Sequence, residues 1–198
     1  MIYLSDGKIV AAMMRLSSIL NKSKINSNLM EIYMIFETER TKVRNLNEDD
    51  IEKMVCYRSD ERCNKFQRYE DFNYEYMHNF IEKYAHSIFL SLEDEQHYAI
   101  TLKDDASIVG DFSVFYTEGD NCFTLGITIA PEVQRKGIAY EVLDSTVKKI
   151  REKYPTMDIV ALIEKENAGS IALFQKLGFV EECFEESIES YIYCIYGE

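Results

Sequence analysis

The chain has 198 residues, of which 46% are apolar, and a formal net charge of −13. This length and composition predict one globular domain with a substantial core and argue against a disordered chain. The negative charge argues against nonspecific nucleic-acid binding, and no apolar run reaches the ~18 residues that span a bilayer. We therefore expect a soluble, cytoplasmic protein that binds neither nucleic acid nor membrane. We interpret the negative charge as a solvated acidic surface. Electrostatic attraction of a cationic substrate is the second interpretation.

Residues 1–33 differ from the rest of the chain. Their apolar residues recur at helical spacing, and their basic residues outnumber the acidic ones. We expect an amphipathic helical extension that packs on protein, either on its own acidic domain or across a homodimer; a membrane surface is the alternative. A secretory signal is disfavoured because Arg15 interrupts the short apolar region. Met34 is a methionine at which the main domain could begin, and residues 34–198 are expected to form that domain.

From residue 41 onward the sequence alternates between strand and helix patterns. Asn47 followed by Asp50 resembles a capping box, which predicts the start of a helix. Antiparallel strands followed by β-α-β-α-β predict an α/β protein with a mixed, mostly antiparallel sheet and helices on both faces. The expected elements are strands over 41–46, 97–103, 107–116, 122–129, 158–164, 179–184 and 189–196, and helices over 48–57, 61–86, 137–153 and 168–177.

The cysteines and histidines do not have the spacing of a metal site or a disulfide framework. No two cysteines form C-x-x-C, so we expect reduced structural thiols and no bound metal. The histidines are expected to pack or to lie on the surface. These residues are Cys56, Cys63, Cys122, Cys183, Cys194, His78, His86 and His97.

The most informative segment is residues 134–139, Gln-Arg-Lys-Gly-Ile-Ala, between the strand over 122–129 and the helix over 137–153. Its glycine lets the backbone approach a ligand closely. The amides that open the helix have no intrahelical partner, and the helix dipole favours an anion there. A strand, a basic turn with glycine and a helix N-terminus together predict a pyrophosphate site.

A second segment, residues 167–179, follows the apolar strand over 158–164. Asn167 is a suitable N-cap, and Gly178 just beyond Leu177 indicates the C-terminus of the helix. Ile171, Phe174 and Leu177 fall on one helical face. The pattern predicts a short helix that begins at an asparagine and ends in the sequence Leu-Gly-Phe.

The two segments together, in this order, resemble the acetyl-CoA-binding motifs of the GCN5-related N-acetyltransferases. The first follows that family's pattern Q/R-x-x-G-x-G/A, and the second its asparagine, short helix and L-G-F exit. The resemblance extends over most of the chain, from about residue 34 to 196. Residues 37–50 resemble the first strand and helix of the branch related to the ribosomal-protein N-terminal acetyltransferases.

The resemblance implies an acyl-CoA N-acyltransferase fold in which the strands over 122–129 and 158–164 splay apart. The pantetheine arm of acetyl-CoA would enter that gap and pair with the backbone of Ile127 and Ile129 like an added strand, while their side chains pack in the core. The implied cofactor-binding residues are Ile127, Thr128, Ile129, Gln134, Arg135, Lys136, Gly137, Ile138, Ala139, Asn167, Ser170, Phe174 and Lys176.

The catalytic residues follow the family pattern only in part. Many members place a proton-donating tyrosine where this chain has Phe174, which cannot donate. The ribosomal-protein branch often has a serine three residues after the asparagine, and Ser170 stands there. Its hydroxyl can hydrogen-bond the departing sulfur; the alternative is that it binds its own helix backbone.

The general base is left open by the sequence. Some relatives carry a glutamate on the strand before the phosphate turn, where this chain has Phe123 or Thr124. Asp111, Tyr116 and Glu118 are nearby alternatives, each more typical of a surface group, and a water relay to solvent could also serve.

The resemblance implies an acetyl-CoA-dependent N-acetyltransferase that acts on a primary amine by direct attack. The amine could belong to a protein N-terminus or to a small molecule. One alternative is a non-catalytic acyl-CoA-binding or regulatory module of the same fold. A nucleotide-binding protein is disfavoured, because the chain has neither G-x-x-x-x-G-K-[ST] nor a G-x-G-x-x-G after a strand.

Overall fold

The computed structural model describes residues 34–67, 72–93 and 95–198, and the helix expected over 1–33 lies outside these ranges. The strands within them begin and end close to their expected positions, and a short first strand was not expected. The strands are β1 (Met34–Glu37), β2 (Thr41–Asn45), β3 (Gln96–Leu102), β4 (Asp105–Thr117), β5 (Cys122–Ile129), β6 (Asp158–Glu164), β7 (Val180–Glu185) and β8 (Ser190–Ile195).

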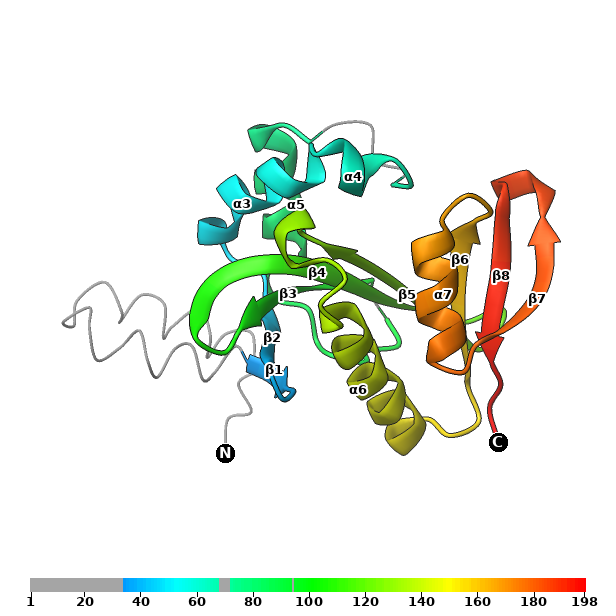
Figure 1. The fold of residues 1–198 in the computed structure, drawn as a ribbon. Coiled ribbons are helices and arrows are strands. Elements are labelled where there is room, and N and C mark those ends of the chain that lie inside the picture. The colour runs from blue at the N-terminus through cyan, green and yellow to red at the C-terminus, as the bar shows by residue number, and fades with distance from the viewer. Residues whose placement is uncertain (1–33, 68–71, 94) are drawn as a thin grey trace, which may run out of the picture. The chain divides into compact units, whose positions relative to one another are not determined.

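These strands form one sheet in the order β1-β2-β3-β4-β5-β6-β8-β7 (Figure 1). From β2 onward, β5 and β6 pair in parallel. The pairs β2–β3, β3–β4, β4–β5, β6–β8 and β7–β8 are antiparallel. The mixed, mostly antiparallel sheet expected from the sequence is therefore confirmed.

The described helices include α3 (Ile51–Arg58), α4 (Glu61–Asn64), α5 (Tyr74–Tyr84), α6 (Ile138–Lys153) and α7 (Ala168–Lys176). The helix expected over 48–57 opens with a 3₁₀ turn at Glu48–Asp50 and continues as α3. The region expected to be helical over 61–86 contains α4 and α5, separated by a non-helical stretch in its described part.

The helices cover both faces of the sheet, as expected (Figure 1). On β3, Tyr98 and Ile100 belong to the same buried cluster as side chains of α6 and α7, such as Leu143 and Phe174. Ala99, which points the opposite way because strand side chains alternate, belongs to a second cluster with α3 and α5. The sheet therefore has a separate hydrophobic core on each face, one with α6 and α7 and the other with α3 and α5.

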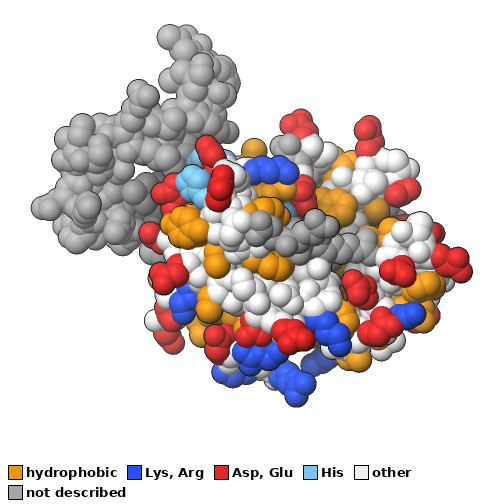
Figure 2. All heavy atoms as spheres, turned by 90° about the horizontal axis from the view of Figure 1, so that it is seen from above, with side chains coloured by type: hydrophobic (Ala, Val, Ile, Leu, Met, Phe, Trp, Pro, Cys, Tyr) orange, Lys and Arg blue, Asp and Glu red, His pale blue; other side chains and the backbone are white. Residues whose placement is uncertain are grey.

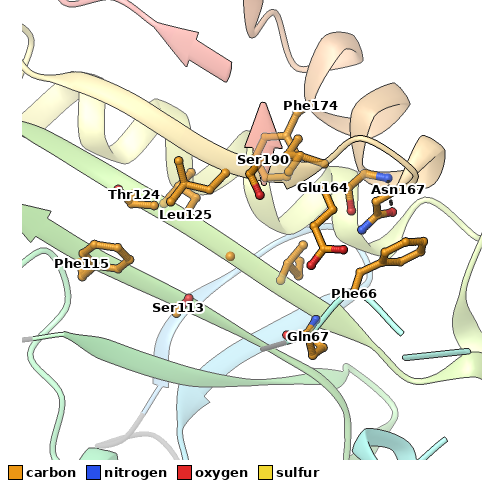
Figure 3. A pocket seen from close by; sticks show the side chains of 15 residues that line it. Phe66, Gln67, Ser113, Phe115, Thr124, Leu125, Glu164, Asn167, Phe174 and Ser190 are labelled. Atoms are coloured by element: carbon orange, nitrogen blue, oxygen red, sulfur yellow. Dashed lines mark hydrogen bonds between the residues drawn. The ribbon is translucent and has the colours of Figure 1, made fainter. Parts of the chain in front are cut away.

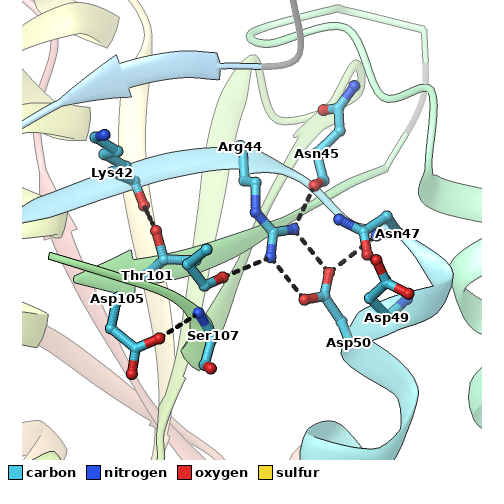
Figure 4. Close-up of polar contacts among 10 residues, drawn as sticks. Lys42, Arg44, Asn45, Asn47, Asp49, Asp50, Thr101, Asp105 and Ser107 are labelled. Atoms are coloured by element: carbon cyan, nitrogen blue, oxygen red, sulfur yellow. Dashed lines mark hydrogen bonds and ion pairs between the residues drawn. The ribbon is translucent and has the colours of Figure 1, made fainter. Parts of the chain in front are cut away.

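The capping box predicted at Asn47 is present (Figure 4). The Asn47 amide donates to Oδ2 of Asp50 at 2.9 Å. Both carboxylate oxygens of Asp50 also accept from Arg44 of β2, each at 2.7 Å, and both side chains are buried. This pair fixes the connection from β2 into α3.

A second buried pair attaches α3 to the centre of the sheet. Arg58, near the end of α3, donates to the carboxylate of Asp111 on β4, and the Tyr57 hydroxyl donates to the same carboxylate. Burial raises the pKa of Tyr57 well above its ordinary value, and the negative charge of Asp111 adds to the shift. The phenol therefore stays protonated and remains a donor.

Candidate active site

β5 and β6 are paired only over their first residues. The parallel register joins Cys122 to Asp158 and ends with Thr124 opposite Val160. Beyond that point each strand pairs only with its outer neighbour: β5 continues along β4 as far as Ile129, and β6 continues along β8 as far as Glu164. The expected splaying of these two strands is therefore confirmed.

A cavity of about 300 Å³ lies at this opening (Figure 3). β4, β5, β6, β8, α7 and the segment that follows α4 contribute its walls. Asn167, Ser170 and Phe174 from the second sequence motif line it together with Ile127 of β5. Among the described residues that line it, the only ionisable side chain is that of Glu164.

The backbone of Ile127 faces the gap between the strands. The Ala130 amide donates to the Val109 carbonyl at 2.9 Å, on the β4 side. Backbone groups of a strand alternate in direction, so the N–H and C=O of Ile127 and Ile129 point toward β6. The ladder to β6 has already ended at Thr124. Ile127 can therefore pair with an extended ligand.

The Ile129 carbonyl has protein partners. It accepts a hydrogen bond from Nε2 of Gln134 at 2.9 Å and one from the thiol of Cys63 at 3.3 Å. Burial raises the pKa of Cys63 to about 11, so the thiol remains a donor. The Gln134 side chain therefore holds the turn to the end of β5. The Thr128 hydroxyl accepts a hydrogen bond from Gln67, in the segment after α4, at 3.1 Å.

The turn before α6 has the geometry expected of an anion site. Gly137 is its N-cap with φ of 82°, and Arg135 also has a positive φ, 59°. A left-handed backbone favours glycine, and successive amides in such turns form concave anion-binding nests. The first-turn amides of α6, including those of Ile138 and Ala139, have no helical partner by geometry. The side chains of Arg135 and Lys136 are exposed.

Arg40 adds a positive charge to this turn that sequence reasoning missed. Its Nη1 donates to the Lys136 carbonyl at 2.8 Å, and its Nε pairs with Glu141 of α6 at 2.7 Å. Burial alone would raise the pKa of Glu141, but hydrogen bonds from Thr38 and Arg40 hold it below its ordinary value. The ion pair therefore persists at neutral pH and fixes the turn against the loop between β1 and β2.

Asn167 and Ser170 meet at the start of α7. Asn167 is the N-cap, and its Oδ1 accepts from the Ser170 amide at 3.1 Å. The capping role belongs to Asn167, and the Ser170 hydroxyl has no hydrogen-bond partner within the described part of the chain. Phe174, one turn later, is buried with its ring edge against Phe179 at a centroid distance of 5.0 Å.

Lys176, near the end of α7, reaches toward α6. Its ammonium lies 4.4 Å from the centroid of the Tyr140 ring, in the first turn of that helix. The contact brings a second positive charge close to the turn that precedes α6. The sequence motifs on the two helices, far apart in the chain, are therefore joined in space.

The candidate bases from the sequence are not gathered at the cavity. Asp111 is held by Arg58 and Tyr57, Tyr116 bonds Asn121 at 3.2 Å, and Glu118 is exposed. Asp111 is thus a structural ion-pair partner, and the expectation that it lies on the surface was wrong, because it is 4% exposed. Phe123 is buried in the α6-side core.

Glu164, at the end of β6, is the cavity carboxylate that sequence reasoning did not single out (Figure 3). Its position three residues before the capping asparagine was the available signal. Thr124 lines the same cavity but cannot act as a base at neutral pH. Within the described ranges, no group of three or more His, Cys, Asp or Glu side chains could hold a metal ion. No helix in those ranges is long and apolar enough to span a membrane.

Comparison with known proteins identifies this arrangement. The family model of the acetyltransferase (GNAT) domain matches residues 40–180. An N-alpha-acetyltransferase of Saccharolobus solfataricus is 22% identical over 69% of this chain and 78% of its own length.

Solved structures share the fold. A GNAT-family acetyltransferase from Bacillus anthracis has a TM-score of 0.69 at 23% identity, over 81% of this chain and 96% of its own. A putative ribosomal-protein-serine acetyltransferase from Vibrio cholerae has a TM-score of 0.67 at 18% identity, over 83% and 97%. Because the family model covers more than half of the chain, including both motifs and the two splayed strands, the chain belongs to the GNAT family of acetyltransferases.

Proposed function

We propose that the protein transfers the acetyl group of acetyl-CoA to a primary amine by direct attack. The observation that carries the proposal is the single opening between β5 and β6. It has a free backbone edge at Ile127, the Asn167 and Ser170 pair on its wall, and the phosphate turn at the end of the same β5 strand. Holding two reactants in one such geometry supplies much of the rate of an acyl transfer.

The residues present fit acetyl-CoA as a co-substrate. The turn from Arg135 to Ala139 offers amides and positive charge to a pyrophosphate, and Arg40 and Lys176 add charge beside it. Ile127 offers a strand edge to an extended amide chain, and its amide is a suitable donor to a thioester carbonyl. When bound, acetyl-CoA supplies an activated acyl group, and no metal is required for this chemistry.

The acceptor class is a primary amine, either a protein N-terminus or a small molecule. The Vibrio cholerae structure is named for a ribosomal-protein acceptor and the Saccharolobus solfataricus relative for an alpha-amino group, whereas another structure of the same fold is named for spermidine; these names favour a primary amine and leave both acceptor types in the panel. Figure 2 shows acidic side chains spread over the face seen from above, which favours a cationic acceptor. We further propose that the protein works in the cytoplasm.

A thiol-release assay tests the proposal. The protein is incubated with acetyl-CoA and a panel of peptides with free N-termini, polyamines and simple alkylamines, and free CoA thiol is measured. We expect release that depends on the amine. Thermal stabilisation by acetyl-CoA without release for any amine would instead identify a non-catalytic acyl-CoA-binding module. Stabilisation by ATP and not by acetyl-CoA would contradict both.

Replacing Gly137 by aspartate is expected to weaken acetyl-CoA binding by about 10–100-fold, the loss of one charge-assisted contact or more. A side chain at φ of 82° is strained, and a Cβ there would lie 3.3 Å from Nη2 of Arg40. The added carboxylate would face the phosphates. Isothermal titration calorimetry measures the change.

Two controls separate the effect of the added charge at residue 137 from backbone strain and from the change in net charge. Gly137→Ala introduces the backbone strain without the charge and should lose less affinity than Gly137→Asp. Gly119→Asp adds the same charge in the turn between β4 and β5, where a Cβ meets no atom within 4 Å, and should bind like wild type. Full acetyl-CoA affinity in Gly137→Asp would show that the phosphates lie elsewhere.

A further inference from the structure

We propose that Glu164 binds the ammonium group of the acceptor and takes up the proton that its nitrogen loses on acetylation. This rests on the function proposed above and names the residue that recognises the acceptor. It also narrows the acceptor to a primary ammonium that presents a single positive charge to the cavity, next to an apolar or aromatic group.

The position of Glu164 is fixed on both sides. It is the last residue of β6, opposite Ser190 of β8, and its carbonyl accepts from the Asn167 amide at 2.9 Å. The turn that begins at Glu164 thus leads directly into α7 and Ser170. Figure 3 shows the Glu164 carboxylate directed into the cavity on the side of Phe66 and Gln67.

Among the residues that the structure describes, none places a positive charge on the Glu164 carboxylate. Glu164 is partly buried, and within the described residues its side chain makes no hydrogen bond or ion pair. The next two residues differ: Lys165 and Glu166 are exposed and pair with each other at 3.6 Å. A carboxylate that faces a cavity and lacks a partner is stabilised by a cation from outside the chain.

The other walls limit what that cation can be. Phe66, Phe115 and Leu125 give the cavity apolar sides, and the remaining lining groups are neutral. One carboxylate among walls that are otherwise neutral favours one ammonium, because a second positive charge would lie there without a counter-charge, and the apolar sides favour an apolar group next to it. The ammonium of Lys65 lies 5.0 Å from the centroid of the Phe66 ring, and Lys65 does not line the cavity.

The chemistry balances around this carboxylate. Amines of this class are largely protonated at pH 7, so Glu164 first binds the ammonium ion. Loss of one proton to solvent leaves the neutral amine, which attacks the thioester carbonyl. As the C–N bond forms and the C–S bond breaks, the bonding pair leaves with the sulfur as thiolate. The second proton, from the nitrogen that has become positive, passes to Glu164 and then to solvent.

Glu164→Gln keeps the shape of the side chain and removes its charge. With n-butylamine and the amines that the panel identifies, kcat/KM should fall about 10²-fold or more, the effect of removing a general base. The Kd for acetyl-CoA should not change, because the phosphate turn is untouched. Glu166→Gln removes an equal charge two residues away, outside the cavity, and should behave like wild type. Wild-type kcat/KM in Glu164→Gln would overturn the assignment.

A binding measurement separates this inference from the proposed function. Calorimetric titration of n-butylammonium chloride into the CoA-bound protein should show binding to wild type and none to Glu164→Gln, with n-butanol as the uncharged control. If wild type binds the ammonium in this way but acetylates no amine, the ammonium site stands and the proposed function fails. Equal binding to both proteins, or binding to neither, would overturn the ammonium site whatever the turnover.

Discussion

Replacing Asp111 by alanine is expected to lower the free energy of unfolding by about 3–5 kcal/mol, the usual cost of breaking a buried ion pair from one side. Arg58 is 2% exposed and Asp111 4%, so the substitution removes the Asp111 carboxylate from a buried guanidinium that it contacts. It also removes the acceptor of the Tyr57 hydroxyl. For a domain of this size the midpoint of thermal unfolding should fall by roughly 6–20 °C.

Urea unfolding followed by circular dichroism measures this change. Asp104→Ala is the matched control, because Asp104 is exposed in the turn before β4 and such surface substitutions usually cost under about 0.5 kcal/mol. Asp111→Asn, which keeps an acceptor oxygen for Tyr57, should fall between the two. Equal stability of the Asp111→Ala and Asp104→Ala variants would show that the ion pair contributes nothing to folding.

Local patterns predicted the regular elements well, because their signals are short in range. The strand over 158–164 has the predicted boundaries, since its apolar run stands between Pro155, which cannot continue the preceding helix, and the Asn167 cap. The turn before α6 is likewise a local feature, because the positive φ angle of Gly137 favours glycine there. The short β1 has little pattern of its own and forms by pairing with its neighbour at the sheet edge.

The contents of the site depended on contacts that sequence spacing does not reveal. Arg58 and Asp111 lie on different elements and meet only when α3 packs on β4, so Asp111 looked like a free carboxylate. Gln134 follows the family motif, yet its amide is directed back to the Ile129 carbonyl. Glu164 became distinctive only when the separation of β5 and β6 left it facing a cavity.

Ser170 is expected to act on the leaving sulfur, and its surroundings now make that expectation sharper. The Asn167 side chain caps α7 through the Ser170 backbone amide at 3.1 Å. The hydroxyl is not needed for the cap, and Ser170 and Ile127 both line the cavity. A donor there can hydrogen-bond a departing thiolate.

Ser170→Ala should therefore lower kcat by about 10²–10⁴-fold, the range for a lost proton donor, while the Kd for acetyl-CoA stays at the wild-type value. The cap survives because alanine keeps the backbone amide. Ser145→Ala on α6, a serine that does not line the cavity, is the control and should keep full turnover. Phe174→Tyr in the Ser170→Ala background returns a hydroxyl donor to the cavity wall and should recover part of the loss. Wild-type thiol release by Ser170→Ala with a competent amine would assign protonation of the sulfur to water or to another acid.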